Sequence, residues 1–227
     1  MASALSSIGD PNFFKKGVRH LKKQDPLLAS LIDRHGVLPF APEGEMFQSL
    51  VESILTQQLA WSAASAIIGR VKTLYPGGII DAKSLYATPT SKLRKAGVSP
   101  QKIRYLKDLS RRVSREKLDL EALKVAKDET LLEALDEVLG IGPWTIHMLM
   151  IFTLGRPDVL PVDDLGIRKG IQSLYSLSEI PEKEEIEKLA KNWHPYCSIA
   201  SLYLWRHQDS TKKMLEVKLN IPAKTKT

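Results

Sequence analysis

The chain has 227 residues, of which 43% are hydrophobic and 26% charged, so it has a globular composition and enough length to bury a core. Its 33 lysines and arginines against 26 acidic residues leave a formal charge of +7, which favours a polyanionic partner such as nucleic acid. Because Cys197 is the one cysteine, the composition excludes an internal disulfide and a four-cysteine iron–sulfur cluster within this chain.

The same composition bears on location. A single cysteine suits a reducing compartment, the first ten residues lack the pattern of a secretory signal, and no apolar run is long enough to span a bilayer. We therefore expect an intracellular protein with no membrane partner, in a bacterial or archaeal cytoplasm or in a nucleus. A basic surface that serves only solubility remains the alternative to nucleic-acid binding.

Helical spacing of apolar residues dominates the chain, and strand signals are scarce, so we expect an all-α fold. The pattern predicts one helix from Phe47 to Leu59. It predicts a second helix after Ala60, which strong breakers end at residues 75–78.

Three further helices are predicted, and a hairpin separates the last two. Ser99 is predicted to cap a helix that continues from Gln101 to about Val113, with Pro100 at its first position. Further helices are expected over residues 131–139 and 144–154. The segment Gly-Ile-Gly-Pro at residues 140–143 separates these last two helices, which predicts a helix, a tight hairpin and a helix.

The remaining chain is also expected to be helical. Residues 155–158 form a turn, and Pro-Val-Asp-Asp at 161–164 enters the next helix. Pro181 and Pro195 precede two more helices. A frayed, basic tail is expected from Asn220 onward.

The hairpin has the features of an anion site. Gly140 and Gly142 allow a tight turn and close approach of a ligand, while Ile141 anchors the turn in the core. N–H groups here and at the start of the next helix, with the helix dipole behind them, suit a DNA phosphate. On its own the motif is weak, because a glycine-rich turn between helices is often only a turn.

An acidic pair, Asp163 and Asp164, stands at the next helix start. One aspartate there can be a simple N-cap. The second can stay ionised beside the helix dipole, stabilise an oxocarbenium-like sugar as a glycosidic bond breaks, and orient a water molecule.

Competing chemistries fit less well. The histidines form no His-Glu-x-x-His pair or other metal-ligand spacing. Neither a phosphate-binding Gly-x-x-x-x-Gly-Lys loop nor a Gly-x-Ser-x-Gly elbow occurs in the sequence. The five histidines are His20, His35, His147, His194 and His207.

Two runs resemble the hairpin and Pro-Asp signature of the helix-hairpin-helix base-excision DNA glycosylases, above all the 3-methyladenine DNA glycosylase II group. They are Leu-Gly-Ile-Gly-Pro-Trp-Thr-Ile-His-Met-Leu-Met-Ile-Phe from Leu139 and Leu-Pro-Val-Asp-Asp-Leu-Gly-Ile-Arg-Lys from Leu160. Supporting matches are Ile-Leu-Thr-Gln-Gln-Leu-Ala from Ile54, Leu-Arg-Lys-Ala-Gly-Val-Ser-Pro-Gln-Lys-Ile from Leu93, and Pro-Tyr-Cys-Ser-Ile-Ala-Ser-Leu-Tyr-Leu-Trp from Pro195.

The resemblance implies a fold of two helical layers with a cleft between them. Residues 46–155 would form a central domain containing the helix-hairpin-helix at about 131–154, and residues 1–45 with 156–227 would form the second layer. The partner would be damaged double-stranded DNA, bound by a monomer. No cofactor is required and no iron–sulfur cluster is expected, but Na⁺ or K⁺ is expected at the carbonyls of Asp136, Val138 and Ile141, where it bridges to a phosphate.

The resemblance also assigns roles at the site. Asp164 is the expected catalytic carboxylate, with Asp163 as its capping neighbour and as the runner-up for catalysis. Trp144 holds the place of the lysine that attacks the sugar in lyases, which implies a monofunctional glycosylase of alkylated purines in base excision repair. Trp144 would stack on the flipped base; a core anchor beneath the hairpin is the alternative.

Other positions carry over in the same way. Met148 and Phe47 complete the expected base pocket. Gln58 and Leu59 are the expected wedge into DNA, although Gln58 can also be read as a polar helix end. Gly140, Gly142 and Thr145 are the expected phosphate contacts.

Two departures from the family pattern leave alternatives open. Ala60 and Cys197 stand where relatives often have a polar residue and an arginine. A catalytically weak or inactive helix-hairpin-helix DNA-binding protein is one alternative. A bifunctional glycosylase and lyase is the other, and Trp144 argues against it.

Overall fold

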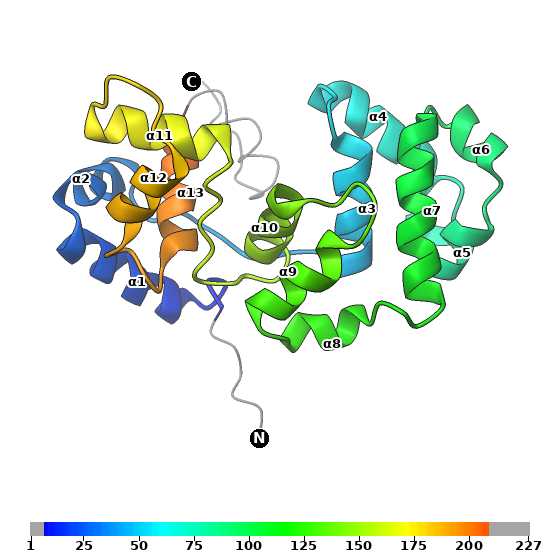
Figure 1. Cartoon of the computed structure of the whole chain (residues 1–227), viewed down its shortest axis with the longest axis horizontal. Helices are drawn as coiled ribbons and strands as arrows, with labels where there is room; N and C mark the ends of the chain where they lie inside the picture. Colours follow the sequence, from blue (N-terminus) through cyan, green and yellow to red (C-terminus); the bar gives the residue numbers. More distant parts are fainter. Residues whose placement is uncertain (1–6, 209–227) are drawn as a thin grey trace. The chain divides into compact units, whose positions relative to one another are not determined.

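The computed structural model describes residues 7–208, and every regular element in that range is helical: thirteen α-helices and one 3-10 turn, with no strand (Figure 1). The predicted all-α fold class is therefore confirmed. No helix in the same range is long and apolar enough to cross a bilayer. The tail predicted from Asn220 lies outside the described residues.

The chain divides into two compact units: Met1–Glu43 with Met150–Thr227, and Gly44–Leu149. We call them the terminal unit and the central unit. The predicted division into residues 46–155 and residues 1–45 with 156–227, and the predicted cleft between two helical layers, stay predictions.

The terminal unit is organised around α13 (Cys197–His207), which is buried along nearly its whole length. Helices α1, α2 and α11 pack against it, and their apolar faces cover its sides. The helices of this unit are α1 (Pro11–Gln24), α2 (Pro26–His35), α11 (Leu165–Tyr175), α12 (Lys183–Ala190) and α13, and α10 (Pro143–Phe152) ends within it.

The central unit has α3 and α7 at its centre. Helix α3 buries Leu50, Ile54 and Leu55, and α7 turns Ile103 and Leu106 inward at helical spacing. The helices of this unit are α3 (Met46–Thr56), α4 (Trp61–Lys72), the 3-10 turn η1 (Pro76–Gly78), α5 (Ala82–Ala87), α6 (Thr90–Lys95), α7 (Pro100–Ser114), α8 (Leu120–Val125), α9 (Asp128–Asp136) and most of α10.

Several predicted helix starts are confirmed. The Ser99 side chain accepts the N–H of Lys102 at 3.2 Å, and Pro100 is the first residue of α7. Pro143 begins α10, and α11 begins at Leu165, directly after the Pro-Val-Asp-Asp segment that was predicted to enter a helix. In each case the residue types fit a helix start, because the cap oxygen satisfies a free N–H and proline needs no donor there.

The predicted helix from Phe47 to Leu59 is too long, since α3 ends at Thr56. Lys102 of α7 donates to the Leu55 carbonyl at 2.8 Å, and Gln58 adopts a left-handed backbone with φ of +57°. A tertiary contact on the last turn and a left-handed residue both end the helix.

The helix predicted over 131–139 runs instead from Asp128 to Asp136. A continuing helix would have used the Leu139 N–H on Leu135, but Val138 donates to that carbonyl at 3.0 Å. The Leu139 N–H is taken by Asp108 at 3.1 Å. A carboxylate from α7 thus ends α9 early and begins the hairpin.

Candidate active site

The hairpin of the central unit joins α9 to α10 and depends on two glycines of different kinds. Gly140 has φ of +79°, and a Cβ there would lie 2.2 Å from Cδ2 of the Tyr105 ring. Gly142 has open space on its Cβ side, with no atom within 4 Å. Ile141 is only 3% exposed and anchors the turn, as predicted. Gly140 therefore serves the turn, and Gly142 leaves room for a ligand to approach the backbone.

Three side chains from outside the hairpin hold it. Tyr105 packs on Gly140, Asp108 accepts the Leu139 N–H at 3.1 Å, and Gln57 Nε2 donates to the Gly140 carbonyl at 2.8 Å. Two of these come from α7 and one from the loop after α3. The hairpin backbone is thus fixed before any ligand arrives.

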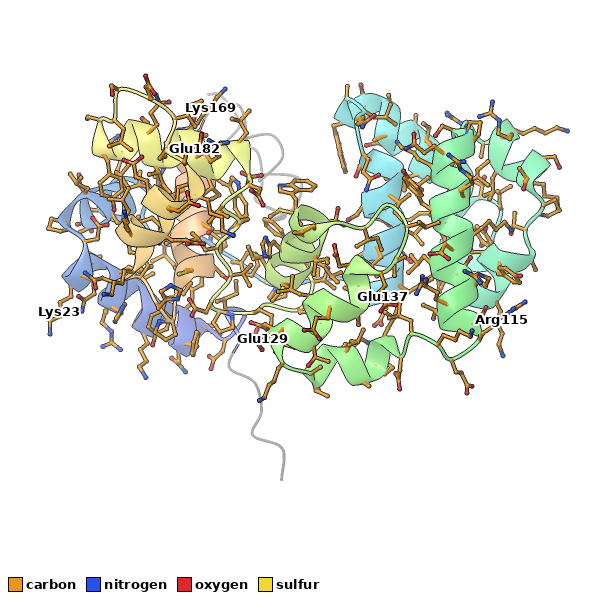
Figure 2. All side chains as sticks on the ribbon, viewed as in Figure 1. Lys23, Arg115, Glu129, Glu137, Lys169 and Glu182 are labelled. Carbon is orange, nitrogen blue, oxygen red and sulfur yellow. The ribbon has the colours of Figure 1, made fainter. Side chains whose placement is uncertain are left out.

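Asp108 is itself held by arginines. Arg111 Nη2 lies 2.6 Å from one carboxylate oxygen, and Arg112 Nε lies 3.0 Å from the other. Arg112 Nη1 also lies 3.3 Å from Oε2 of Glu137. Glu137 follows α9 and is labelled in Figure 2. Burial opposes ionisation of Asp108, but the hydrogen bonds from Arg111, the Leu139 N–H and Arg112 outweigh it and keep the pKa of Asp108 below its usual value.

The loop between α3 and α4 is exposed and partly apolar. Gln58 and Leu59, the predicted wedge, both lie there, and Leu59 is 40% exposed. The positive φ of Gln58 is uncommon for a residue with a side chain. Trp61 is 52% exposed beside them, an aromatic that the sequence analysis did not single out. The Gln57–Gly140 hydrogen bond ties this loop to the hairpin.

The residues predicted for the base pocket are not all together. Trp144 is 38% exposed at the start of α10, so it is not the core anchor beneath the hairpin; Ile141 has that place. Met148 lies one turn later on α10 and is 4% exposed. Thr145, in the first turn of α10, is 5% exposed, so its predicted phosphate contact stays a prediction.

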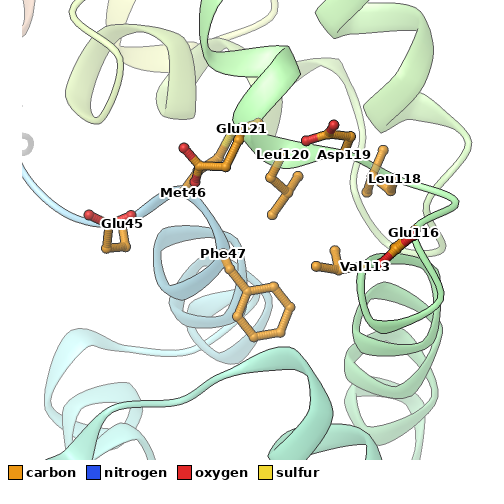
Figure 3. A pocket seen from close by; sticks show the side chains of 9 residues that line it. All are labelled: Glu45, Met46, Phe47, Val113, Glu116, Leu118, Asp119, Leu120 and Glu121. Atoms are coloured by element: carbon orange, nitrogen blue, oxygen red, sulfur yellow. The ribbon is translucent and has the colours of Figure 1, made fainter.

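Phe47 lies at the start of α3, where its ring points into a cavity of about 550 Å³ (Figure 3). Neither Trp144 nor Met148 lines this cavity. Its lining includes four acidic residues: Glu45, Glu116, Asp119 and Glu121. A pocket shared by Phe47 and Trp144 stays a prediction.

In the terminal unit, the Asp164 carboxylate is 7% exposed at the N-terminus of α11. Its Oδ1 accepts the Ile167 N–H at 2.9 Å and the Trp205 Nε1–H at 2.7 Å. The prediction that Asp163 is the cap beside a free Asp164 is wrong: Asp164 is the cap, and Asp163 is exposed. The physical reason is register, because only Asp164 immediately precedes the first helical residue.

Trp205 is the functional candidate that the sequence analysis missed. It is fully buried on α13, and its ring centroid lies 5.5 Å from that of Phe152. A Cβ on Gly166 would lie 2.9 Å from both Asp164 Oδ1 and Trp205 Cδ1, so only glycine leaves room for this contact. The run that ends in Trp205 resembles the glycosylase family in sequence, but the resemblance assigned no role to this tryptophan.

The segment before Asp164 is fixed to α13 as well. The Pro157 carbonyl accepts the Ser198 N–H at 3.0 Å, and the Val159 N–H donates to Ser198 Oγ at 2.9 Å. Asp164 is thus held from both sides, by the segment that leads to it and by Trp205. A carboxylate fixed at a helix N-terminus can stabilise a positive charge that develops beside it.

Comparison with known proteins agrees with this arrangement. The model of the HhH-GPD superfamily of base excision DNA repair proteins matches residues 51–195. DNA-3-methyladenine glycosylase 1 of Schizosaccharomyces pombe is 34% identical over 164 residues, which cover 71% of this chain and 72% of that protein. The chain spans 64% of the length of another relative, YfjP of Bacillus subtilis.

Two solved structures are similar. The DNA-3-methyladenine glycosidase of Bacillus halodurans has a TM-score of 0.78 at 37% identity, covering 92% of this chain and 94% of that one. The 3-methyladenine DNA glycosylase Mag1 of Schizosaccharomyces pombe, in complex with abasic DNA, has a TM-score of 0.75 at 31% identity, covering 84% and 95%. By its hairpin, its fold and its matched residues, the chain belongs to the HhH-GPD superfamily of base excision DNA repair proteins.

Proposed function

We propose that this protein is a monofunctional DNA glycosylase that removes alkylated purines, of the 3-methyladenine and 7-methylguanine type, from double-stranded DNA in base excision repair. The observation that carries the proposal is the buried Asp164 carboxylate, fixed by Ile167 and Trp205 at the start of α11. The names of its similar proteins support the same substrate class. The protein would act as a monomer inside the cell.

The chemistry needs few residues because the lesion supplies its own activation. Alkylation at purine N3 or N7 puts a positive charge on the base, so the base leaves as a neutral molecule with the electron pair of the C1′–N bond. Asp164 stabilises the oxocarbenium-like sugar. Water then adds its oxygen to C1′ and releases a proton, which leaves an abasic site.

Trp144 suits a flipped cationic base. Its residue is 38% exposed, and the π face of an indole stacks on a base and attracts a cation. An indole cannot form a Schiff base with the sugar, so we expect no lyase step. Borohydride reduction during turnover should trap no covalent adduct; a trapped adduct would show a bifunctional enzyme.

The hairpin would hold the DNA backbone. A Cβ on Gly142 would meet no atom within 4 Å, so a phosphate can approach this backbone, and such a contact positions DNA without reading its sequence. Gln58 and Leu59 on the exposed loop would fill the gap left by the flipped base. We expect the protein to bend the duplex and to rotate the damaged purine out of the base stack, as minor-groove proteins bend DNA and base-flipping enzymes extrude a base.

A monovalent cation fits the hairpin carbonyls of Asp136, Val138 and Ile141 by chemistry. The Val138 carbonyl accepts the Ile141 N–H at 3.0 Å, and a carbonyl oxygen keeps a second lone pair for an ion. When bound, Na⁺ or K⁺ would add positive charge for a phosphate. The chain's own contribution to such a site would be the three backbone carbonyl oxygens.

The test is base release from methylated duplex DNA by the wild type, Asp164→Asn and Asp163→Asn. Asparagine has nearly the same size and keeps an oxygen for the Ile167 and Trp205 donors, so folding should be retained while the negative charge is lost. We expect Asp164→Asn to release base about 100-fold more slowly or worse, about 2.7 kcal/mol of barrier. Asp163→Asn, the neighbouring exposed carboxylate, should stay within a few-fold of wild type.

Other outcomes separate the alternatives. Equal losses in both variants would remove the assignment to Asp164. No release by folded wild type, together with salt-sensitive DNA binding, would favour a helix-hairpin-helix DNA-binding protein without catalysis.

A further inference from the structure

A second cluster of reactive side chains lies in the terminal unit and has no part in the proposed reaction. One ligand atom each from Asp158, His194 and Cys197 lie within 4.8 Å of one another. The histidine and cysteine are three residues apart, but Asp158 comes from a segment 36 residues before His194. Because the third ligand is so distant in the chain, the spacing of residues in the sequence does not indicate this cluster.

The distances converge on one nitrogen. His194 Nδ1 lies 2.8 and 2.9 Å from the two Asp158 oxygens and 3.5 Å from Cys197 Sγ. Zinc bonds of about 2.3 Å to sulfur and about 2.0–2.1 Å to nitrogen, at tetrahedral angles, place sulfur and nitrogen about 3.5 Å apart. The sulfur–nitrogen spacing already matches, and the oxygens need to move outward by about half an ångström.

This convergence excludes a different reading, a nucleophilic Cys-His-Asp triad. Such a triad needs the thiol on one ring nitrogen and the carboxylate on the other. Here the carboxylate and the thiol both face Nδ1. One ligand atom from each of the three side chains thus lies on the same side of the imidazole ring, where a single ion can contact all three.

Two of the three donors are already held in place. Cys197 is buried at the first position of α13, and its N–H donates to Asp158 Oδ1 at 3.2 Å. The neighbouring residues connect the same two segments, because the Ser198 N–H donates to the Pro157 carbonyl at 3.0 Å. The His194 side chain is 53% exposed, which gives an ion a path from solvent and leaves room for water.

We propose that Asp158, His194 and Cys197 form a binding site for a borderline-soft divalent cation of the Zn²⁺ class, with water in the fourth position. Thiolate, imidazole and carboxylate are together the donor set that Zn²⁺ takes in proteins. The site is separate from Asp164 and does not depend on the proposed glycosylase activity.

Binding balances by release of protons without any redox change. The thiol proton leaves to solvent as the sulfur–metal bond forms. His194 Nδ1 donates to Asp158 before an ion binds, so its proton must also leave Nδ1, and the neutral imidazole that binds the ion then carries its one proton on Nε2. Burial and the charge of Asp158 raise the pKa of the Cys197 thiol when no ion is present. Affinity should therefore rise with pH, because the metal competes with that proton.

An ion here would join the segment that leads to Asp164 to the helix that carries Trp205. Asp158 lies six residues before Asp164, and Cys197 begins the helix that ends near Trp205. The expected role is structural, since the ion would add a link between two segments that hydrogen bonds already connect.

The experiment titrates the full-length, reduced, chelator-free protein with Co²⁺ and follows thiolate-to-cobalt charge-transfer absorption. We expect one equivalent to bind and Zn²⁺ to displace it. Cys197→Ser should abolish the band, and His194→Gln should weaken binding by at least about 10-fold. His207→Gln, a histidine at the other end of α13, is the matched control and should bind as wild type.

Thermal unfolding gives a second measurement. Free Zn²⁺ at about 100 times its wild-type Kd stabilises by about 2.7 kcal/mol, which should raise Tm by several degrees in wild type. The same zinc concentration is at most about ten times the Kd of His194→Gln, so the shift in that variant should be about half as large or less. His194 is exposed, so this variant should fold even where Cys197→Ser does not. The proposal is overturned if the wild type binds no stoichiometric metal, or if His194→Gln binds Co²⁺ with the wild-type affinity and shows the full wild-type Tm shift.

Discussion

The hairpin at residues 139–142 and the Asp164 carboxylate are held by opposite means. The hairpin offers backbone N–H groups, and side chains from elsewhere, Tyr105, Asp108 and Gln57, fix that backbone. Asp164 offers a side chain, fixed by a backbone N–H and by Trp205. Changes near the hairpin should therefore alter DNA affinity, whereas changes near Asp164 should alter the chemical step.

Gly166→Ala should produce the largest effect on chemistry among the changes that leave Asp164 itself intact. The new methyl group would lie 2.9 Å from both Asp164 Oδ1 and Trp205 Cδ1, so the carboxylate or the indole must move. Displacement of a reacting group by about 1 Å can cost about 100-fold in rate. We expect single-turnover base release to slow by about that factor, with DNA affinity nearly unchanged.

The matched control is Gly69→Ala on α4, a helical glycine with no atom within 4 Å of its Cβ position. Alanine there should be neutral or stabilise by up to about 1 kcal/mol. Equal rates for Gly166→Ala and Gly69→Ala would show that the Asp164–Trp205 contact does not support the reaction.

Trp205→Phe should have the next largest effect. Phenylalanine keeps most of the buried ring but removes the Nε1–H donor to Asp164, and hydrogen bonds to charged groups contribute about 1.5–3 kcal/mol. We expect base release to slow by about 10-fold or more in single-turnover assays.

Trp193→Phe is a close control, because Trp193 is also fully buried and donates its indole N–H to a carboxylate, that of Asp25, at 3.0 Å. It should lose similar stability without loss of base release. If both variants slow release equally, stability and not the positioning of Asp164 explains the result.

The two glycines of the hairpin should respond differently to substitution by alanine. Gly142→Ala meets no neighbour, so folding should persist while the methyl group obstructs a phosphate and weakens DNA binding by about 5- to 10-fold, close to the 1.4 kcal/mol that corresponds to a tenfold change. Gly140→Ala meets the Tyr105 ring and a positive φ, so it should lower both stability and affinity.

Fluorescence anisotropy at two salt concentrations and urea unfolding would measure the two effects. Unchanged DNA affinity in a folded Gly142→Ala would mean that phosphate does not approach this backbone. Loss of stability in Gly142→Ala as large as in Gly140→Ala would contradict the distinction between the two glycines.

Local sequence signals predicted much of the fold. Apolar spacing gave the helices, and Ser99 and Pro143 marked true helix starts, because a cap or a proline acts on its own first turn. The ends of α3 and α9 were placed too late. Lys102 and Asp108 of α7 end those helices, and no local pattern contains a contact with a distant helix.

The candidate site was predictable in part for the same reason. Asp164 and the glycines stand in short motifs, whereas Trp205 reaches Asp164 across 41 positions and Gln57 reaches Gly140 across 83. Residues that act by positioning another residue leave no local pattern. The cap was assigned to Asp163 because sequence could not decide the register of two adjacent aspartates.

Asp108→Asn should have the smallest effect and one that depends on pH. The pKa of Asp108 lies below its usual value of 3.8, so its charge stabilises the folded state above about pH 4, and this contribution is lost as the pH falls through the lowered pKa. We expect the variant to lose about 1–2 kcal/mol of unfolding free energy at pH 7 and progressively less below pH 4. Urea unfolding across that range, with the exposed cap Asp119→Asn as control, measures it. A deficit that stays constant down to pH 2.5 would mean that packing around Asp108, and not its charge, holds the hairpin.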